Sequence, residues 1–132
     1  MPFVLDASVS VAWFLDEEDD TASAAWELLR ADSASVPLIW WYEIRNALVT
    51  AGRRRRLSPA DIDDAWERLR VLPVNIDEQL KDDPIRGLAE QHGLTFYDAA
   101  YLELALRLRF PLATSDRALA KAARSEHVPL IG

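Results

Sequence analysis

Four carboxylate residues stand near the expected ends of helices and strands, although they lie far apart in the chain: Asp6, Glu43, Asp98 and Asp116, here called the four acids. If three such side chains met at about 5 Å, with an effective dielectric near 20, each pair would repel by roughly 3 kcal/mol. The cluster would then either take up protons, which raises pKa values, or bind a divalent cation. Oxygen ligands suit Mg²⁺ or Mn²⁺. Each acid alone could be a helix cap or a surface residue, so the prediction of a metal site rests on their joint placement.

Other catalytic chemistries find little support in the chain. It contains no cysteine and only two histidines, His92 and His127, which are not in a paired ligand spacing, so the sequence does not favour a zinc site. It also shows no Ser-His-Asp arrangement and no glycine-rich phosphate loop. A cation held by carboxylates can activate a water, orient a phosphodiester and stabilise the leaving oxygen. The pattern therefore favours phosphodiester hydrolysis.

The elements that must position these residues alternate along the chain. Short apolar runs predict strands at 3–5, 36–39, 73–76, 111–114 and 128–131, and helical patterns occur at 9–15, 21–30, 84–92, 97–109 and 116–124. A further helix ends at Gly52, and Ser58 with Pro59 is a good start for another. This order predicts a three-layer α/β/α fold with a mainly parallel central sheet of about five short strands.

The expected sheet also indicates where a ligand would bind. In open sheets of this class, ligands bind beyond the carboxyl ends of the strands. Asp6 directly follows the first expected strand and Asp116 follows the fourth. Glu43 and Asn46 are one helical turn apart and so share a side of their helix. This edge of the sheet is therefore the predicted site.

Length and composition set the broad class. The 132 residues fit a single domain, 1–132, and no apolar run approaches the roughly 18 to 20 residues that span a bilayer. The N-terminus lacks the features of a signal peptide, and with no cysteine present we expect a cytoplasmic protein without a membrane anchor. The net charge of -7 would repel nucleic acid overall. The run 53–56, four arginines, could form a basic patch or could be a solvated helix end.

Four segments of the chain resemble the PIN-domain family, and within it the VapC-like toxins of type II toxin–antitoxin systems. They are VLDAS at 4–8, YEIRNAL at 42–48, YDAAY at 97–101 and LATSD at 112–116. Each segment is a weak signal alone, but the ordered set spans almost the whole chain and is specific.

The resemblance implies roles for named residues. The four acids would hold one or two Mg²⁺ or Mn²⁺ ions and carry the catalysis, with Asp116, at a position that varies across the family, able to act through water. Ser8 and Thr114 match positions that support the acids or ions through their hydroxyls, and both could instead be helix-start caps. Asn46 matches a polar position beside the acidic helix face, and could instead be merely exposed.

The resemblance also implies partners. It predicts a homodimer and a cognate VapB-like antitoxin whose C-terminal segment fills the active-site groove, where an arginine would suit the acids. The aromatic run Trp40, Trp41 and Tyr42 could contribute to a protein interface or to the core.

These observations favour an endoribonuclease in which a metal-activated water attacks an RNA phosphate. Two alternatives remain open from the sequence. A catalytically silent PIN scaffold would bind RNA or protein and leave RNA whole in the presence of metal. A receiver-like phosphoacceptor domain fits less well, because it requires adjacent acids after the first strand and a lysine after the last, whereas Lys121 falls within an expected helix.

Overall fold

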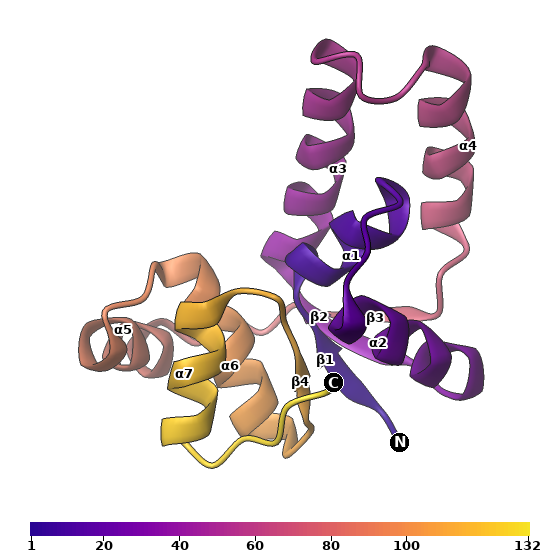
Figure 1. Ribbon diagram of the computed structural model, residues 1–132. Coiled ribbons are helices and arrows are strands. Elements are labelled where there is room, and N and C mark those ends of the chain that lie inside the picture. Colours follow the sequence, from indigo (N-terminus) through magenta and orange to yellow (C-terminus); the bar gives the residue numbers. More distant parts are fainter.

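The computed structural model describes all residues, 1–132, and builds them around a parallel sheet with strand order β3-β2-β1-β4 (Figure 1). The strands are β1 (Phe3–Leu5), β2 (Ala34–Pro37), β3 (Val74–Asp77) and β4 (Leu112–Ala113). The helices are α1 (Ala7–Phe14), α2 (Asp20–Ala31), α3 (Leu38–Arg53), α4 (Pro59–Arg70), α5 (Asp82–His92), α6 (Phe96–Leu108) and α7 (Arg117–Ser125).

The sheet confirms the predicted fold class but has four strands rather than about five. The expected last strand, 128–131, forms only an isolated parallel bridge between Leu130 and Leu112. Pro129 lacks a backbone N–H and so cannot donate to a ladder; its carbonyl accepts the Leu112 N–H at 2.9 Å. The second strand also lies two residues earlier than expected, because Pro37 already caps α3.

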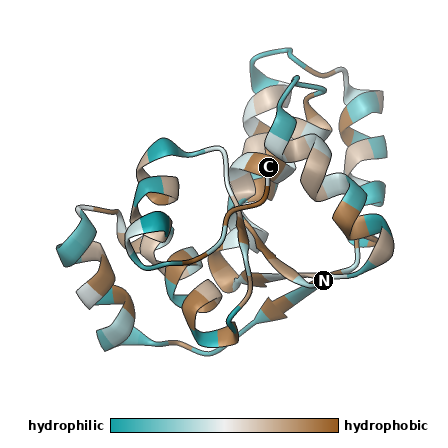
Figure 2. Cartoon of the chain, turned by 60° about the horizontal axis from the view of Figure 1, so that its bottom comes forward, coloured by the Kyte–Doolittle hydropathy of each residue, from teal (hydrophilic) through white to brown (hydrophobic).

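The core lies between the sheet and two groups of helices. All three residues of β1 are fully buried, as expected of a strand with a neighbour on each side and helices on both faces. Helix α6 contacts β1, β2 and β4 and is buried on several sides, whereas α2 and α3 contact strands from the other group. Figure 1 shows α5, α6 and α7 together on one side and α1 to α4 on the other. Hydrophobic residues gather on the strands, and the outer helix turns are mainly hydrophilic (Figure 2).

Helices α3 and α4 form an arm that extends beyond the sheet (Figure 1). Its tip holds the four exposed arginines 53–56, of which Arg55 has a left-handed backbone with φ of 57°. Ser58 starts α4 as predicted, since its Oγ accepts the Asp61 N–H at 3.1 Å. The arginine run is thus the end of a helix and the turn that follows it. None of the helices in the chain combines the length and apolarity needed to span a bilayer.

Candidate active site

The four acids come from four different elements at the carboxyl edge of the sheet. Asp6 follows β1 and precedes α1, and Asp116 follows β4 and caps α7. Glu43 lies in the second turn of α3 and Asp98 in the first turn of α6. Their charges act on one another: those of Asp98 and Asp116 raise the pKa of Asp6, and those of Asp6 and Asp98 raise the pKa of Glu43. The four acids therefore face one region of the molecule.

Asp6 is the most buried of the four acids, with 5% of its surface exposed. Its Oδ2 accepts hydrogen bonds from the hydroxyls of Ser8 and Thr114, each at 2.7 Å. Its Oδ1 accepts no side-chain hydrogen bond. Because every fully buried side-chain oxygen of the chain has a hydrogen-bond partner, Oδ1 is not fully buried and is open to solvent or a ligand. Burial is the main cause that raises the Asp6 pKa, and the two hydroxyls partly oppose it. Asp6 thus presents one held and one free oxygen.

Glu43 is held by a residue that the sequence reasoning missed. The Tyr101 hydroxyl donates to Glu43 Oε1 at 2.7 Å, and the tyrosine side chain has no solvent exposure. Burial raises the Glu43 pKa, and this hydrogen bond lowers it. The Tyr101 pKa is raised far above its usual value by burial and by the charges of Asp6 and Glu43, so the phenol stays a donor. A signal was present, because Tyr101 is the one hydroxyl-bearing side chain in the apolar run after Asp98.

Asp98 and Asp116 differ in how free their carboxylates are. Burial, followed by the Asp116 charge, raises the Asp98 pKa, and the side chain of Thr95, the residue that caps α6, opposes this shift through a hydrogen bond. In contrast, Asp116 Oδ1 accepts the Leu119 N–H at 2.9 Å as the cap of α7. The Asp116 N–H also donates to Thr114 Oγ1 at 3.1 Å. Asp116 therefore has one oxygen in a structural role and one left for a ligand or water.

The three supporting residues of the prediction lie in different settings. Ser8 Oγ accepts the Ser115 N–H at 3.1 Å as well as donating to Asp6, so it links α1 to the loop after β4. Thr114 is buried and contacts both Asp6 and Asp116. Asn46 is exposed on α3, one turn beyond Glu43, and its side chain makes no hydrogen bond. The geometry therefore joins Ser8 and Thr114 to the acids and leaves Asn46 at the margin.

The donor set has the chemistry that a magnesium or manganese ion needs. Free carboxylate oxygens remain on Asp6, Asp98 and Asp116, and hydroxyl hydrogen bonds orient the first of these. No three of the His, Asp and Glu side chains form a ready-made cage, however. Mg²⁺ usually keeps several waters and takes only one or two direct carboxylates, so it does not require such a cage.

If Glu43 helps to hold a cation, replacing Tyr101 with phenylalanine is expected to weaken Mn²⁺ binding about tenfold, because the tyrosine orients the Glu43 carboxylate. The free energy of unfolding of the metal-free protein should fall by about 1 kcal/mol, the usual net value of one hydrogen bond. Calorimetric Mn²⁺ titration and chemical denaturation measure the two effects. Ser125→Ala, which removes an exposed hydroxyl at the end of α7, is the control and should change neither. Equal Mn²⁺ affinity in Tyr101→Phe and wild type would show that Tyr101 serves packing alone.

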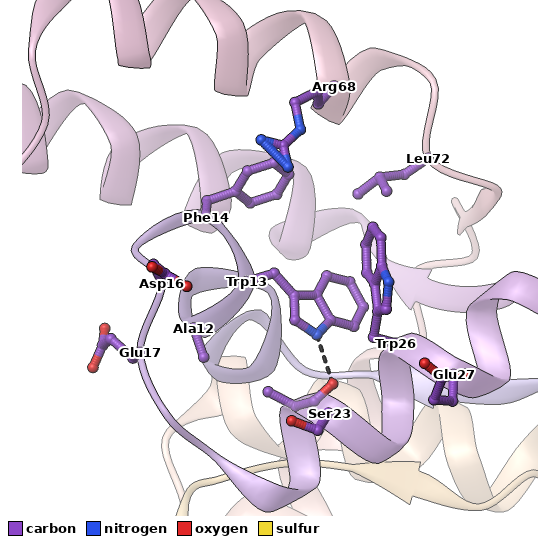
Figure 3. Close-up of a pocket in the computed structure, with 11 residues that line it drawn as sticks. Ala12, Trp13, Phe14, Asp16, Glu17, Ser23, Trp26, Glu27, Arg68 and Leu72 are labelled. Carbon is purple, nitrogen blue, oxygen red and sulfur yellow. Dashed lines mark hydrogen bonds between the residues drawn. The ribbon is translucent and has the colours of Figure 1, made fainter.

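A pocket of about 430 Å³ lies away from the four acids, among α1, α2 and α4 (Figure 3). We call it the tryptophan pocket because Trp13 and Trp26 line it with their rings edge to face and 5.2 Å between centroids. Trp13 Nε1 donates to the Ala22 carbonyl at 2.7 Å, and Trp26 is 40% exposed. None of the four acids lines this pocket. The tryptophan pocket is therefore separate from the acidic centre.

The aromatic run of α3 divides between core and surface. Trp40 is buried, and its Nε1 donates to Ser10 Oγ at 2.9 Å, which gives the indole a polar partner inside the core. Trp41 and Tyr42 are 40% and 58% exposed. Of the three aromatics, only these two are available to a partner.

Comparison with known proteins gives matches along nearly the whole chain. A family model described as PIN domain matches residues 3–125, which include all four acids. Ribonuclease VapC3 of Pyrobaculum aerophilum is 34% identical over 130 aligned residues, covering 92% of this chain and 94% of the relative. Ribonuclease VapC9 of Mycobacterium tuberculosis is 30% identical over 131 aligned residues, covering 93% and 92%. The crystal structure of PAE2754 from Pyrobaculum aerophilum superimposes with a TM-score of 0.70 at 25% identity, covering 92% of this chain and 84% of that one.

Proposed function

This chain belongs to the PIN-domain family, and on that premise we propose that it is an Mg²⁺- or Mn²⁺-dependent endoribonuclease, the toxin of a type II toxin–antitoxin pair, formed as a single domain over residues 1–132. One observation carries the proposal. Asp6 is buried at the carboxyl edge of the sheet with one oxygen held by two hydroxyls and one oxygen free, beside three further acids. The similarity to proteins named ribonucleases supports RNA as the substrate.

In the proposed mechanism, the four acids hold the cation and the reacting water. When bound, the ion would polarise the phosphate and lower the pKa of a coordinated water. Ser8 and Thr114 keep Asp6 in one orientation, and Tyr101 does the same for Glu43. One of the four acids would accept a proton from the attacking water. Water then bonds to phosphorus as the bond to the leaving ribose oxygen breaks.

We further propose that a VapB-like antitoxin blocks the enzyme through two surfaces. An arginine of the antitoxin would pair with the four acids, since the guanidinium fork matches carboxylates. The tryptophan pocket, whose rim carries the acids Asp16, Glu17 and Glu27, suits an apolar helix flanked by basic residues. The Trp26 side chain, partly exposed there, would form the centre of such a contact. Cleavage must therefore be assayed on protein free of antitoxin.

The test is cleavage of a total RNA pool by antitoxin-free protein, in Mg²⁺ or Mn²⁺ and in EDTA. The proposed enzyme makes discrete cuts that need the metal and disappear in Asp98→Asn. A catalytically silent scaffold would bind RNA in metal and leave it whole. A receiver-like domain fits less well, because Lys121 lies inside α7 and not at the end of β4, the last strand. Cuts that persist in EDTA or in Asp98→Asn would reveal a contaminating nuclease and remove support for the proposal.

The proposed homodimer would use an exposed apolar surface beside the acids, made of Leu38, Tyr42, Leu80, Phe96 and Tyr97 around a hollow of about 290 Å³. Tyr42 and Tyr97 are sequence neighbours of Glu43 and Asp98. A second copy bound to this surface would therefore form one side of the acidic centre. Large exposed apolar patches of this kind mark protein interfaces.

Replacing Leu80 with arginine is expected to convert the dimer to a monomer, because a charge would be buried without a partner in the interface. Leu80 is 78% exposed in one chain, so the fold itself should be unaffected. Light scattering after size-exclusion chromatography measures the mass. Val71→Arg, at a residue that is 80% exposed at the end of α4, is the matched control and should leave the dimer intact. An intact dimer in Leu80→Arg would place the interface elsewhere.

A further inference from the structure

One face of α3 leads from the acidic centre to the arginines at the tip of the helical arm. Glu43, Asn46, Thr50 and Arg54 follow one another at spacings of three, four and four residues, so they share this face. At a rise of 1.5 Å per residue, the eleven steps from Glu43 to Arg54 span about 16.5 Å. This row of four side chains therefore extends well beyond the phosphate at which cleavage would occur.

This face is hollowed into a groove of about 290 Å³. Asn46, Thr50, Arg54 and Arg56 supply its polar lining, with Leu15 at the end of α1 and two alanines of α3 completing it. We call it the α3 groove. Helices α1 and α3 contact each other, and both begin at the edge of the sheet where the acids lie (Figure 1). The α3 groove thus begins at Asn46, one helical turn beyond Glu43.

The polar side chains of the α3 groove are free to bind an anion. Arg54 has no carboxylate within 4 Å, and Arg56 has only the distant Glu17, at 3.9 Å. Both members of that pair are about half exposed, and such surface pairs are weak. Asn46 and Thr50 make no side-chain hydrogen bond. In a chain with a net charge of -7, the arginine run 53–56 is also an unusual concentration of positive charge.

We propose that the α3 groove binds the sugar–phosphate backbone of single-stranded RNA on one side of the bond that is cut. This inference rests on the proposed ribonuclease function and extends it to the substrate. Arginine guanidinium groups form paired hydrogen bonds to phosphate, and Asn and Thr side chains commonly contact phosphate and sugar. A single row of donors along one helix follows one strand. The lining is polar apart from one leucine and two alanines, so it offers little to an apolar protein segment.

The groove also accounts for how an acidic protein could hold an acidic polymer. A cation held by the four acids would offset the charge of the phosphate there, and the arginines would attract the neighbouring phosphates. Because these contacts carry no base information, they position the strand and do not select its sequence.

The test measures RNA binding by the double variant Arg54→Gln/Arg56→Gln, made in the uncleaving Asp98→Asn background. The probe is a fluorescein-labelled oligouridylate, followed by anisotropy over a range of KCl concentrations. Loss of two phosphate contacts should weaken binding about tenfold and reduce the slope of log affinity against log salt by about 1.4. Thermal unfolding should be unchanged, since exposed substitutions are nearly neutral.

The control is Arg86→Gln/Arg124→Gln in the same background, which removes the same charge from exposed positions on α5 and α7. Its salt slope should match that of the parent. If both double variants behave alike, the α3 groove does not bind RNA. The inference also fails if the Arg54/Arg56 variant binds RNA as tightly as its parent and loses affinity only for a basic antitoxin peptide. Failure of the wild type to cut any RNA would instead overturn the proposed function, and the binding comparison would still decide on the groove.

Discussion

Replacing Asp6 with asparagine is expected to reduce RNA cleavage by about a thousandfold or more while making the metal-free protein more stable. Loss of a metal-holding carboxylate removes several kcal/mol of transition-state stabilisation, and about 4 kcal/mol corresponds to roughly a thousandfold in rate. Stability should change in the opposite direction. Asp6 is buried, and burial raises its pKa, so its charge is unfavourable in the folded protein without a cation. Asparagine keeps an oxygen for the hydroxyls of Ser8 and Thr114 and carries no charge.

The two effects are measured on the same protein samples. Cleavage is followed in Mn²⁺, and thermal unfolding is followed in EDTA near neutral pH. An increase in the free energy of unfolding of roughly 1 kcal/mol would raise the midpoint by about 4 °C in a chain of this size. Asp63→Asn, an exposed acid in the middle of α4, is the control and should change neither property. Loss of activity together with lower stability would mean that Asp6 acts through the fold and not through its charge.

Mn²⁺ is expected to stabilise the protein strongly and to remove the destabilising effect of raising the pH. At a metal concentration a hundredfold above the dissociation constant, binding adds about 2.7 kcal/mol to the free energy of unfolding. This would raise the unfolding midpoint by about 10 °C. The gain arises because the cation neutralises acids that otherwise repel one another and are partly buried.

The pH dependence without metal follows from the direction of the pKa shifts. The pKa values of Asp6, Glu43 and Asp98 are raised on folding, so their protonated forms favour the folded state. This contribution is complete below the unfolded pKa values, 3.8 for Asp and 4.5 for Glu, and is lost as the pH rises through the folded values. Metal-free protein should therefore lose stability as the pH rises above about 4. The hydrogen bond from Arg107 lowers the pKa of Asp77, so the Asp77 carboxylate stabilises the folded protein. This contribution is lost only as the pH falls below 3.8.

Denaturation at several pH values, with and without Mn²⁺, checks this expectation. Comparison with Asp6→Asn separates the contribution of the four acids from that of other titrating groups. The free energy of unfolding of the variant should fall less steeply as the pH rises. Metal-free stability that rises between about pH 5 and pH 8 in the wild type, and equally in Asp6→Asn, would contradict the role given to these pKa shifts.

Local patterns in the sequence were sufficient to predict the class of fold. The apolar run before Asp6 does form a fully buried strand, and Ser58 with Pro59 does begin α4, because strand hydrophobicity and helix capping depend on neighbouring residues. The ordered segments around the four acids also led to the PIN-domain family, which the family model supports independently. The extent of the sheet was less accurate, because Pro129 interrupts the ladder in a run that is otherwise apolar.

Contacts between distant residues required the tertiary structure. The bond from Tyr101 to Glu43 joins residues 58 positions apart, and that from Thr114 to Asp6 joins residues 108 apart. No local pattern specifies such pairs, since they form only when packing of α6 and β4 against β1 brings the side chains together. Burial of Asp6, and so the direction of its pKa shift, arises in the same way. The types and order of the acidic residues were legible in the chain, whereas their partners, their free oxygens and the groove along α3 arise from the packing of helices around the sheet.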